Sequence, residues 1–249
     1  MTETTETAVV ISAYRESARI AATVDGARSL SGVDLVVVVD DGSRDDGETA
    51  RIAKEHGAIV VRHPRNRGKG AAMETGAATV AAIEAREGAE RSRFLLFLDA
   101  DLEQTAANAA GLIEPVRAGE VGMTIAILPP QLTAGGGHGF VVKLAKDGIR
   151  RAVGFEATQP LSGQRCLTRE AFESALPLAY GFGVETGLTI DVLRAGIKVR
   201  EVEVEFQHRV TGTELAAQLH RAKQYRDVAL ALATRSVPAN LRPTTWRSR

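Results

Sequence analysis

The chain has 249 residues, enough for one large domain or two modest ones with a substantial core. Hydrophobic residues make up 44% and charged residues 25%, which is typical of soluble globular proteins. Basic and acidic residues number 31 each, so no overall field favours binding to nucleic acid or to an anionic membrane. The single cysteine, Cys166, excludes an intramolecular disulfide and favours a reducing compartment.

Targeting and membrane-spanning segments are not expected. The first residues, MTETTETAVVIS, lack the basic region of a secretory signal. The longest uncharged window, 121–142, is broken by Pro129-Pro130 and by three consecutive glycines, a pattern that a membrane helix tolerates poorly. These features predict a cytoplasmic protein.

The first half of the chain alternates short apolar runs with longer amphipathic stretches. The runs are rich in Val, Ile, Leu and Phe and predict strands over 8–12, 35–39, 58–61 and 94–98. The stretches between them predict helices over 17–29, 45–56 and 69–87. Such alternation predicts an α/β fold with a Rossmann-like, mostly parallel sheet flanked by helices. Ligands then bind beyond the carboxyl ends of the strands.

The second half is less regular. Residues 121–128 predict a strand, followed by a proline turn and a glycine-rich loop. Residues 197–206 alternate apolar and charged side chains, as a half-exposed strand does. Residues 214–235 carry apolar side chains on one face of a long predicted helix near the carboxyl end.

Neither an internal repeat nor a low-complexity linker divides the sequence. We therefore predict one domain over 1–249, with a first half at 8–120 and a second half at 121–236. The remaining segment, 237–249, has no periodicity and is expected to be a flexible tail.

Two acids directly follow the fourth predicted strand, in the sequence LFLDADLE. Asp99 and Asp101 are two residues apart, so in extended backbone both carboxylates point to the same side. Two converging carboxylates repel each other unless a cation lies between them. Oxygen ligands suit Mg²⁺ or Mn²⁺, which commonly share phosphate oxygens. A pair of solvated loop acids is the alternative reading of this spacing.

A second acid pair, Asp40-Asp41, follows the second predicted strand in VVVVDDGSRDDG. One of these carboxylates can accept a hydrogen bond from a nucleobase N–H or a ribose hydroxyl, and Gly42-Ser43 permits a tight exit into the next helix. Turn chemistry with a helix cap from Ser43 or Asp45 is an equally good explanation of this segment.

Lys69 lies between two glycines where the third predicted helix starts. An ammonium group there can meet a phosphate, assisted by the free N–H groups of the helix. The segment is not a P-loop, because the required glycine spacing and the Ser or Thr after the lysine are missing.

The four motifs together resemble a known family in their order and spacing. They are ISAYRE (11–16), VVDDGSRDD (38–46), NRGKGAA (66–72) and FLDADLE (97–103). This series resembles family-two glycosyltransferases, which have a GT-A fold, over nearly the whole chain. The resemblance implies that Asp99 and Asp101 carry a divalent ion. It also implies that the nucleotide sugar is bound by Ala13, Tyr14, Glu16, Asp40, Asp41, Lys69, Asp99 and Ala100. The half at 8–120 is then the nucleotide-sugar-binding half, and the half at 121–236 is the acceptor-binding half.

The second half is similar to glucosyl-3-phosphoglycerate synthases over 135–173, 181–191 and 205–224. This similarity implies that His208 completes the metal site. It also implies that Glu185 lies in the active site, where it orients a sugar hydroxyl or acts as a base. Glu185 and Asp101 are then the expected catalytic residues. A helix N-terminal charge favoured by the helix dipole is the structural alternative for Glu185.

The acceptor side departs from the pattern of those synthases. After Gly137 the synthases continue with Arg-Val-Thr, whereas this chain has His138-Gly139-Phe140, and Val210 follows Arg209 where Asn is expected. Gly137, His138 and Arg209 are the expected acceptor-binding residues. Loss of the arginine fork weakens recognition of a phosphate and a carboxylate, so we do not expect 3-phosphoglycerate as the acceptor.

The leading hypothesis is a metal-dependent transfer of a hexose from a UDP- or GDP-linked sugar to a small polar acceptor. A polyprenyl-phosphate glycosyltransferase is the nearest alternative. Its lipid phosphate would be received by Arg209, Arg221, Lys223 and Arg226 at a membrane surface. A sugar-1-phosphate nucleotidyltransferase fits less well, because no glycine-rich loop follows the first strand. A catalytically silent binder and a homodimer stay open.

Overall fold

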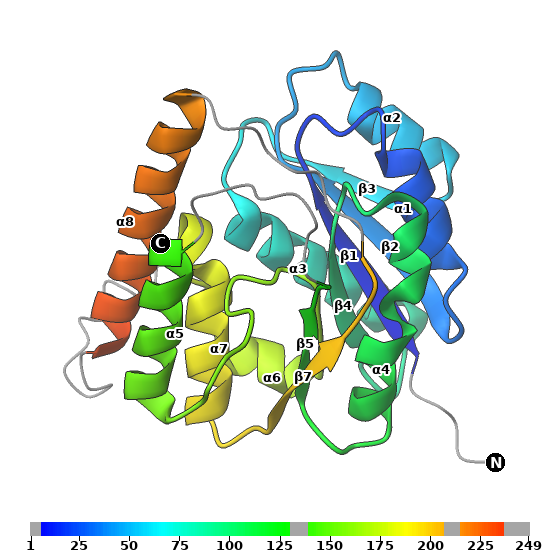
Figure 1. Ribbon diagram of the computed structural model, residues 1–249. Coiled ribbons are helices and arrows are strands. Elements are labelled where there is room, and N and C mark those ends of the chain that lie inside the picture. Colours follow the sequence, from blue (N-terminus) through cyan, green and yellow to red (C-terminus); the bar gives the residue numbers. More distant parts are fainter. Residues whose placement is uncertain (1–5, 130–138, 207–214, 237–249) are drawn as a thin grey trace.

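The computed structural model describes residues 6–129, 139–206 and 215–236. A seven-stranded sheet in the order β3-β2-β1-β4-β6-β5-β7 forms the centre of the molecule (Figure 1). Strand β6 is antiparallel to both of its neighbours, and the other pairs are parallel. The strands are β1 (Thr7–Ala13), β2 (Val33–Asp40), β3 (Ile59–Arg62), β4 (Phe94–Asp99), β5 (Met123–Ile127), β6 (Arg165–Leu167) and β7 (Val199–Glu203). The predicted mostly parallel α/β sheet is confirmed.

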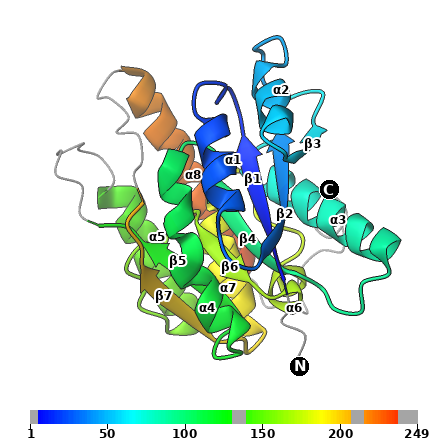
Figure 2. The same cartoon turned by 90° about the vertical axis from the view of Figure 1, so that its right-hand side faces the viewer.

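Helices cover both faces of the sheet, which is why the middle of β1, β2 and β4 is a continuous or nearly continuous apolar run. One face packs against α1 (Ile20–Arg28), α2 (Glu48–Glu55), the 3₁₀ helix η1 (Glu103–Ala109) and α4 (Ala110–Arg117). Figure 2 views the molecule from this side. The opposite face packs against α3 (Lys69–Glu87), α6 (Arg169–Ser174) and α7 (Val184–Arg194).

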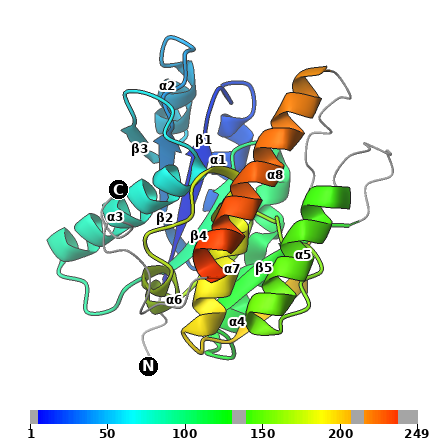
Figure 3. The same ribbon diagram turned by 90° about the vertical axis from the view of Figure 1, so that its left-hand side faces the viewer.

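Two further helices form an outer layer over α7. Helix α5 (Gly139–Val153) and helix α8 (Leu215–Ser236) lie side by side and both contact α7 (Figure 3). Helix α8 also contacts the 3₁₀ turn η2 (Gly181–Gly183), which leads into α7. An ion pair between Asp191 and Arg235 joins α7 to α8. The long helix predicted over 214–235 is therefore confirmed.

Element boundaries differ from the expected ones where the backbone turns sharply. Helix α2 begins at Glu48 rather than at residue 45, because Asp46 and Gly47 both have positive φ, at 54° and 82°. The expected strands at 121–128 and 197–206 are shorter, spanning β5 and β7. No bounds were predicted for strand β6 or for helices α4 to α7, although Glu185 does lie in the first turn of α7, as its structural alternative requires.

The sheet runs through both halves of the chain, because β4 pairs with β6. The boundary expected near residue 120 is therefore no break in the sheet. Among the described residues, no helix combines the length and the apolar character needed to cross a bilayer. The expected flexible tail, 237–249, lies outside the described residues.

Candidate active site

The carboxyl ends of β1, β2 and β4 lie together at one edge of the sheet. The strand register places Ala13 opposite Asp40 and Ser12 opposite Asp99. The Asp41 amide also donates to the Ala13 carbonyl over 2.8 Å. Motifs that are far apart in the sequence therefore meet at this edge, as predicted for ligand sites in open parallel sheets.

Asp41 is a buried centre that fixes the loop before α3. Its carboxylate accepts hydrogen bonds from His63 Nδ1 at 2.6 Å, from the Arg67 amide at 2.8 Å and from the Gly68 amide at 2.8 Å. Only 4% of Asp41 is exposed. The three donors hold the loop 63–68 against the end of β2 and so determine where α3, with Lys69 as its first residue, begins.

Asp40 is fully buried, and its carboxylate also accepts hydrogen bonds from other protein groups. One carboxylate oxygen accepts from Arg62 Nε at 2.9 Å, and the other accepts from the Ser43 amide at 2.9 Å. Gly42 follows with φ of +74°, and a Cβ there would lie 2.4 Å from the Arg65 carbonyl carbon. The loop 63–68 can therefore approach this turn only because the residue is glycine.

The segment after β1 is tied to the turn that follows β2. The Arg15 amide donates to Ser43 Oγ at 2.8 Å, and the Glu16 amide donates to Thr49 Oγ1 at 3.1 Å. Tyr14 is 41% exposed, and the Arg15 guanidinium lies 5.4 Å from its ring centroid. The expected nucleotide-binding residues Tyr14 and Glu16 are thus held at the same edge as the acid pair.

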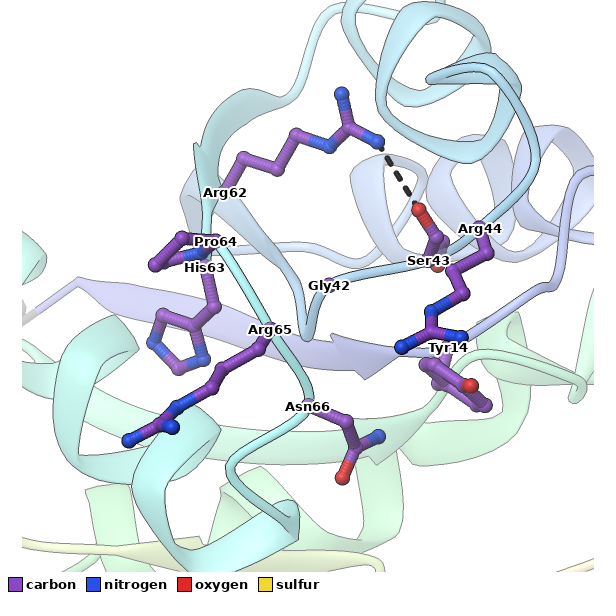
Figure 4. A pocket seen from close by; sticks show the side chains of 9 residues that line it. All are labelled: Tyr14, Gly42, Ser43, Arg44, Arg62, His63, Pro64, Arg65 and Asn66. Atoms are coloured by element: carbon purple, nitrogen blue, oxygen red, sulfur yellow. Dashed lines mark hydrogen bonds between the residues drawn. The ribbon is translucent and has the colours of Figure 1, made fainter.

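A pocket of about 450 Å³ lies among the segment after β1, the turn after β2 and residues 62–66 (Figure 4). Its lining is formed by Tyr14, Gly42, Ser43, Arg44, Arg62, His63, Pro64, Arg65 and Asn66. Within the described part of the chain, the side chains of Arg44, Arg65 and Asn66 have no hydrogen-bond partner. An exposed tyrosine ring beside free cationic and amide donors suits a planar, polar ligand with negative charge nearby.

The second part of the site is a cluster of charges around Lys69. Its ammonium lies 2.5 Å from Asp99 Oδ1 and 3.2 Å from Glu185 Oε1. Gln164 Nε2 donates to the other Asp99 oxygen at 2.6 Å. Burial opposes the charge of Lys69, but the attraction of Asp99 and Glu185 outweighs it and raises the pKa of Lys69, which stays cationic.

A glycine provides the space that this cluster needs. A Cβ at Gly163 would lie 2.0 Å from Lys69 Nζ and 3.2 Å from both Asp99 oxygens. Ala100, the next residue after Asp99, is buried, and its carbonyl accepts from Thr23 Oγ1 at 2.9 Å. That hydrogen bond fixes the turn between Asp99 and the half-buried Asp101.

Of the expected metal-binding and acceptor-binding residues, only Asp99 and Asp101 lie within the described part of the chain. Asp99 and Asp101 flank one turn, but among the described residues no three His, Cys, Asp or Glu side chains group as a metal site. The third expected ligand, His208, lies outside the described residues. The expected acceptor-binding residues Gly137, His138 and Arg209 lie outside them as well.

Several residues of the site were not singled out from the sequence. Arg62 and His63 hold the two acids of the second strand, and Gln164 contacts Asp99. His63 and Arg62 stand just before the NRGKGAA motif, so their position next to it was an available signal. Gln164 had no such signal, because only the antiparallel pairing of β6 with β4 brings it to Asp99.

Comparisons with known proteins identify the family of this chain. The family model for glycosyl transferase family 2 matches residues 8–134. Glycosyltransferase AglJ of Haloferax volcanii is 30% identical over 211 residues, which cover 81% of this chain and 63% of that protein. Glucosyl-3-phosphoglycerate synthase of Mycobacterium tuberculosis is 32% identical over 206 residues, which cover 74% of this chain and 59% of the synthase. The chain thus spans about 60% of the length of these two relatives.

Solved structures of the Mycobacterium tuberculosis synthase have the same fold. Its complex with Mg²⁺ and UDP superposes with a TM-score of 0.72 at 28% identity, covering 94% of this chain and 80% of the synthase chain. Its complex with Mn²⁺, UDP-glucose and phosphoglyceric acid gives 0.70 at 28% identity, covering 94% and 81%. The fold is therefore the GT-A fold. The chain belongs to glycosyl transferase family 2.

Proposed function

We propose that this protein transfers a hexose from a UDP-linked sugar to a small polar acceptor, with Mg²⁺ or Mn²⁺ as the cofactor. The observation that carries the proposal is the cluster in which Lys69 contacts both Asp99 and Glu185. It joins the end of β4, the start of α3 and the first turn of α7 at the carboxyl edge of the sheet, where open α/β sheets bind their ligands. The UDP complexes of the similar synthase support UDP over GDP.

The donor set suits a hard divalent cation. Asp99 and Asp101 offer carboxylate oxygens, the ligands that Mg²⁺ and Mn²⁺ prefer, and the Asp99 side chain is 30% exposed and so accessible. We propose that these two residues hold the ion and that His208 is the third ligand. A bound ion supplies positive charge that stabilises a leaving diphosphate.

The chain's own residues can hold and orient the donor. The pocket beside Tyr14 accommodates the nucleoside, and Lys69, the first residue of α3, holds its ammonium beside Asp99, where we propose that the diphosphate binds. Glu185 is only 11% exposed at its side chain. A carboxylate held there can accept a hydrogen bond from a hydroxyl group of the sugar or take a proton from the acceptor.

The decisive experiment removes one proposed metal ligand. We expect Asp101→Ala to abolish UDP release from UDP-glucose in the presence of Mn²⁺ and to remove the thermal stabilisation that UDP with Mn²⁺ gives the wild type. Asp25→Ala, an exposed acid on α1 that pairs with His56, is the matched control and should behave as the wild type. Near-normal turnover in Asp101→Ala would refute the proposed mechanism.

The identity of the acceptor belongs to the same proposal. At the start of α5 this chain has Phe140, 83% exposed, where the resemblance leads us to expect a threonine. An exposed aromatic ring does not bind a phosphate or a carboxylate, which supports a small polar acceptor other than 3-phosphoglycerate. A panel of 3-phosphoglycerate, small polyols, hydroxy acids and a polyprenyl phosphate tests this.

Transfer to a polyol or hydroxy acid is the expected result of that panel. Transfer to 3-phosphoglycerate would contradict our reading of the acceptor side, and transfer to the polyprenyl phosphate would place the protein in the lipid-linked class. Pyrophosphate release from UTP and glucose 1-phosphate would instead identify a nucleotidyltransferase. Donor binding without any turnover would identify a silent binder.

A further inference from the structure

Arg165, in strand β6, is the largest fully buried side chain of the described residues, with 0% exposure. Its guanidinium makes three hydrogen bonds, and all of them go to uncharged oxygens. No carboxylate in the described part of the chain forms an ion pair with it. The side chain therefore introduces a buried positive charge without a directly bonded counter-ion.

Such a charge is costly to bury. Desolvation lowers the pKa of Arg165 to about 10, although the negative charges of Glu185 and Glu201 act in the opposite direction. The group is still cationic at neutral pH. An apolar residue of similar volume would ordinarily be more stable at a buried strand position, so the arginine is expected to serve another purpose.

The first group of contacts leads to Asp99. Arg165 Nε donates to the Ser162 carbonyl at 2.9 Å, and Nη2 donates to the Pro160 carbonyl at 3.3 Å. Ser162 Oγ in turn donates to Gln164 Oε1 at 3.2 Å, and Gln164 Nε2 donates to Asp99 at 2.6 Å. The guanidinium thus fixes the loop that orients the Asp99 carboxylate.

The second group of contacts leads to Glu185. Arg165 Nη1 donates to Thr189 Oγ1 at 2.9 Å. The same hydroxyl donates to the Glu185 carbonyl one helical turn earlier, also at 2.9 Å. Both ends of one planar, rigid guanidinium are therefore connected to residues that face the ammonium of Lys69.

We propose that Arg165 is a positioning residue that sets the Asp99 carboxylate, through Gln164, and the first turn of α7, which carries Glu185, through Thr189, at a fixed separation across the donor site. This inference rests on the proposed function, since it assumes that Asp99 is a metal ligand. Hydrogen-bond partners that orient metal ligands commonly change metal affinity by about 10- to 100-fold when they are removed.

The test measures Mn²⁺ binding by the loss of the free-ion EPR signal, with UDP present, and UDP binding separately in the absence of metal. We expect Arg165→Lys and Gln164→Leu each to weaken Mn²⁺ binding by about tenfold. UDP binding without metal should change less than twofold, because the nucleoside pocket is fixed by Asp41 and not by Arg165. General loosening of the fold would weaken both.

The other connection has its own variant. Thr189→Val keeps the side-chain volume but removes the hydroxyl that links Arg165 to Glu185. We expect Mn²⁺ binding with UDP to stay within twofold of the wild type, while the rate of UDP release from UDP-glucose falls. If Thr189→Val lost as much Mn²⁺ affinity as Gln164→Leu, the two connections, one from Arg165 to Asp99 and one from Arg165 to Glu185, would not act separately, and that part of the inference would be overturned.

Arg169→Met is the matched control. Arg169 is also a largely buried arginine, four residues further on, but it pairs with Glu84 at 3.0 Å and does not contact the site. It should lower the melting temperature without changing Mn²⁺ affinity. Wild-type Mn²⁺ affinity in both Arg165→Lys and Gln164→Leu would overturn this inference alone. Failure of the wild type itself to bind Mn²⁺ with UDP would overturn the proposed function and the inference with it.

Discussion

The acids at the end of β2 and those at the end of β4 occupy the same edge of the sheet but are held in different ways. Asp40 and Asp41 are buried, and backbone amides are among their donors. Asp99 is 30% exposed at its side chain, and Lys69 and Gln164 donate to it from their side chains. The same residue type at the same edge therefore has two different environments.

The difference lies in which donors can be exchanged. A backbone amide cannot leave a carboxylate unless the loop moves, so the donors at Asp41 fix the shape of the nucleoside pocket. An ammonium on a four-carbon chain can rotate away, and a metal ion or a diphosphate can replace it. The β2 acids are thus expected to act mainly through stability, and the β4 acids mainly through ligand binding.

Asp41→Asn should give the largest effect on stability. The new amide group would face donors that now bind a carboxylate, and at least one buried N–H would lose its acceptor. We expect the free energy of unfolding to fall by about 3 kcal/mol, measured by urea denaturation. Asp25→Asn, which alters an exposed pair with His56, should change it by less than about 0.5 kcal/mol.

An Asp-to-Asn substitution at the end of β4 tests the difference between the two acid pairs. Asp99→Asn should change the free energy of unfolding by less than about 1 kcal/mol, because its surroundings are partly solvated and Lys69 keeps Glu185 as a partner. Mn²⁺ binding with UDP should be lost. Equal destabilisation by Asp41→Asn and Asp99→Asn would show that the two acid pairs do not differ in the way proposed.

A smaller effect is expected from Lys69→Met, which keeps the length of the side chain and removes its charge. We expect UDP to bind about tenfold more weakly, equivalent to about 1.4 kcal/mol, because the phosphates lose a direct cationic partner. Isothermal titration with UDP at fixed Mn²⁺ measures this. Lys54→Met, on α2, is the control and should leave UDP affinity unchanged.

The sequence identified the first half of the fold because its strands are short, continuous apolar runs between amphipathic helices. It could not identify β6, which has only three residues and contains a buried arginine, a residue that ordinarily indicates the surface. The segment that became α5 begins directly after a glycine-rich stretch, which indicated a loop. Tertiary packing on α7 and α8 decides the structure there.

The candidate site likewise contains residues that the sequence indicated and residues that it did not. Asp99, Lys69 and the acid pair were found because they stand at predicted strand and helix ends. The expectation that an acid of the pair contacts the nucleotide directly stays a prediction, since the structure gives Asp40 and Asp41 protein partners. Gln164 and Arg165 reach the site only through the antiparallel pairing of β6, which the local sequence pattern does not encode.

The smallest expected effect concerns the mouth of the nucleoside pocket. Arg44 is exposed there and has no hydrogen-bond partner among the described residues, so under the proposed function we expect it to attract UDP only through a screened, long-range interaction. We expect Arg44→Ala to weaken UDP binding about threefold at low salt. It should have no effect in 0.5 M NaCl, where the Debye length is about 4 Å and the charge is screened. Arg51→Ala, an exposed arginine on α2 that pairs with Glu55, should have no effect at either salt concentration. A loss of UDP affinity in Arg44→Ala that does not depend on salt would instead mean that Arg44 contacts the nucleotide directly. The β2 side of the site would then also contain a residue that acts through ligand binding.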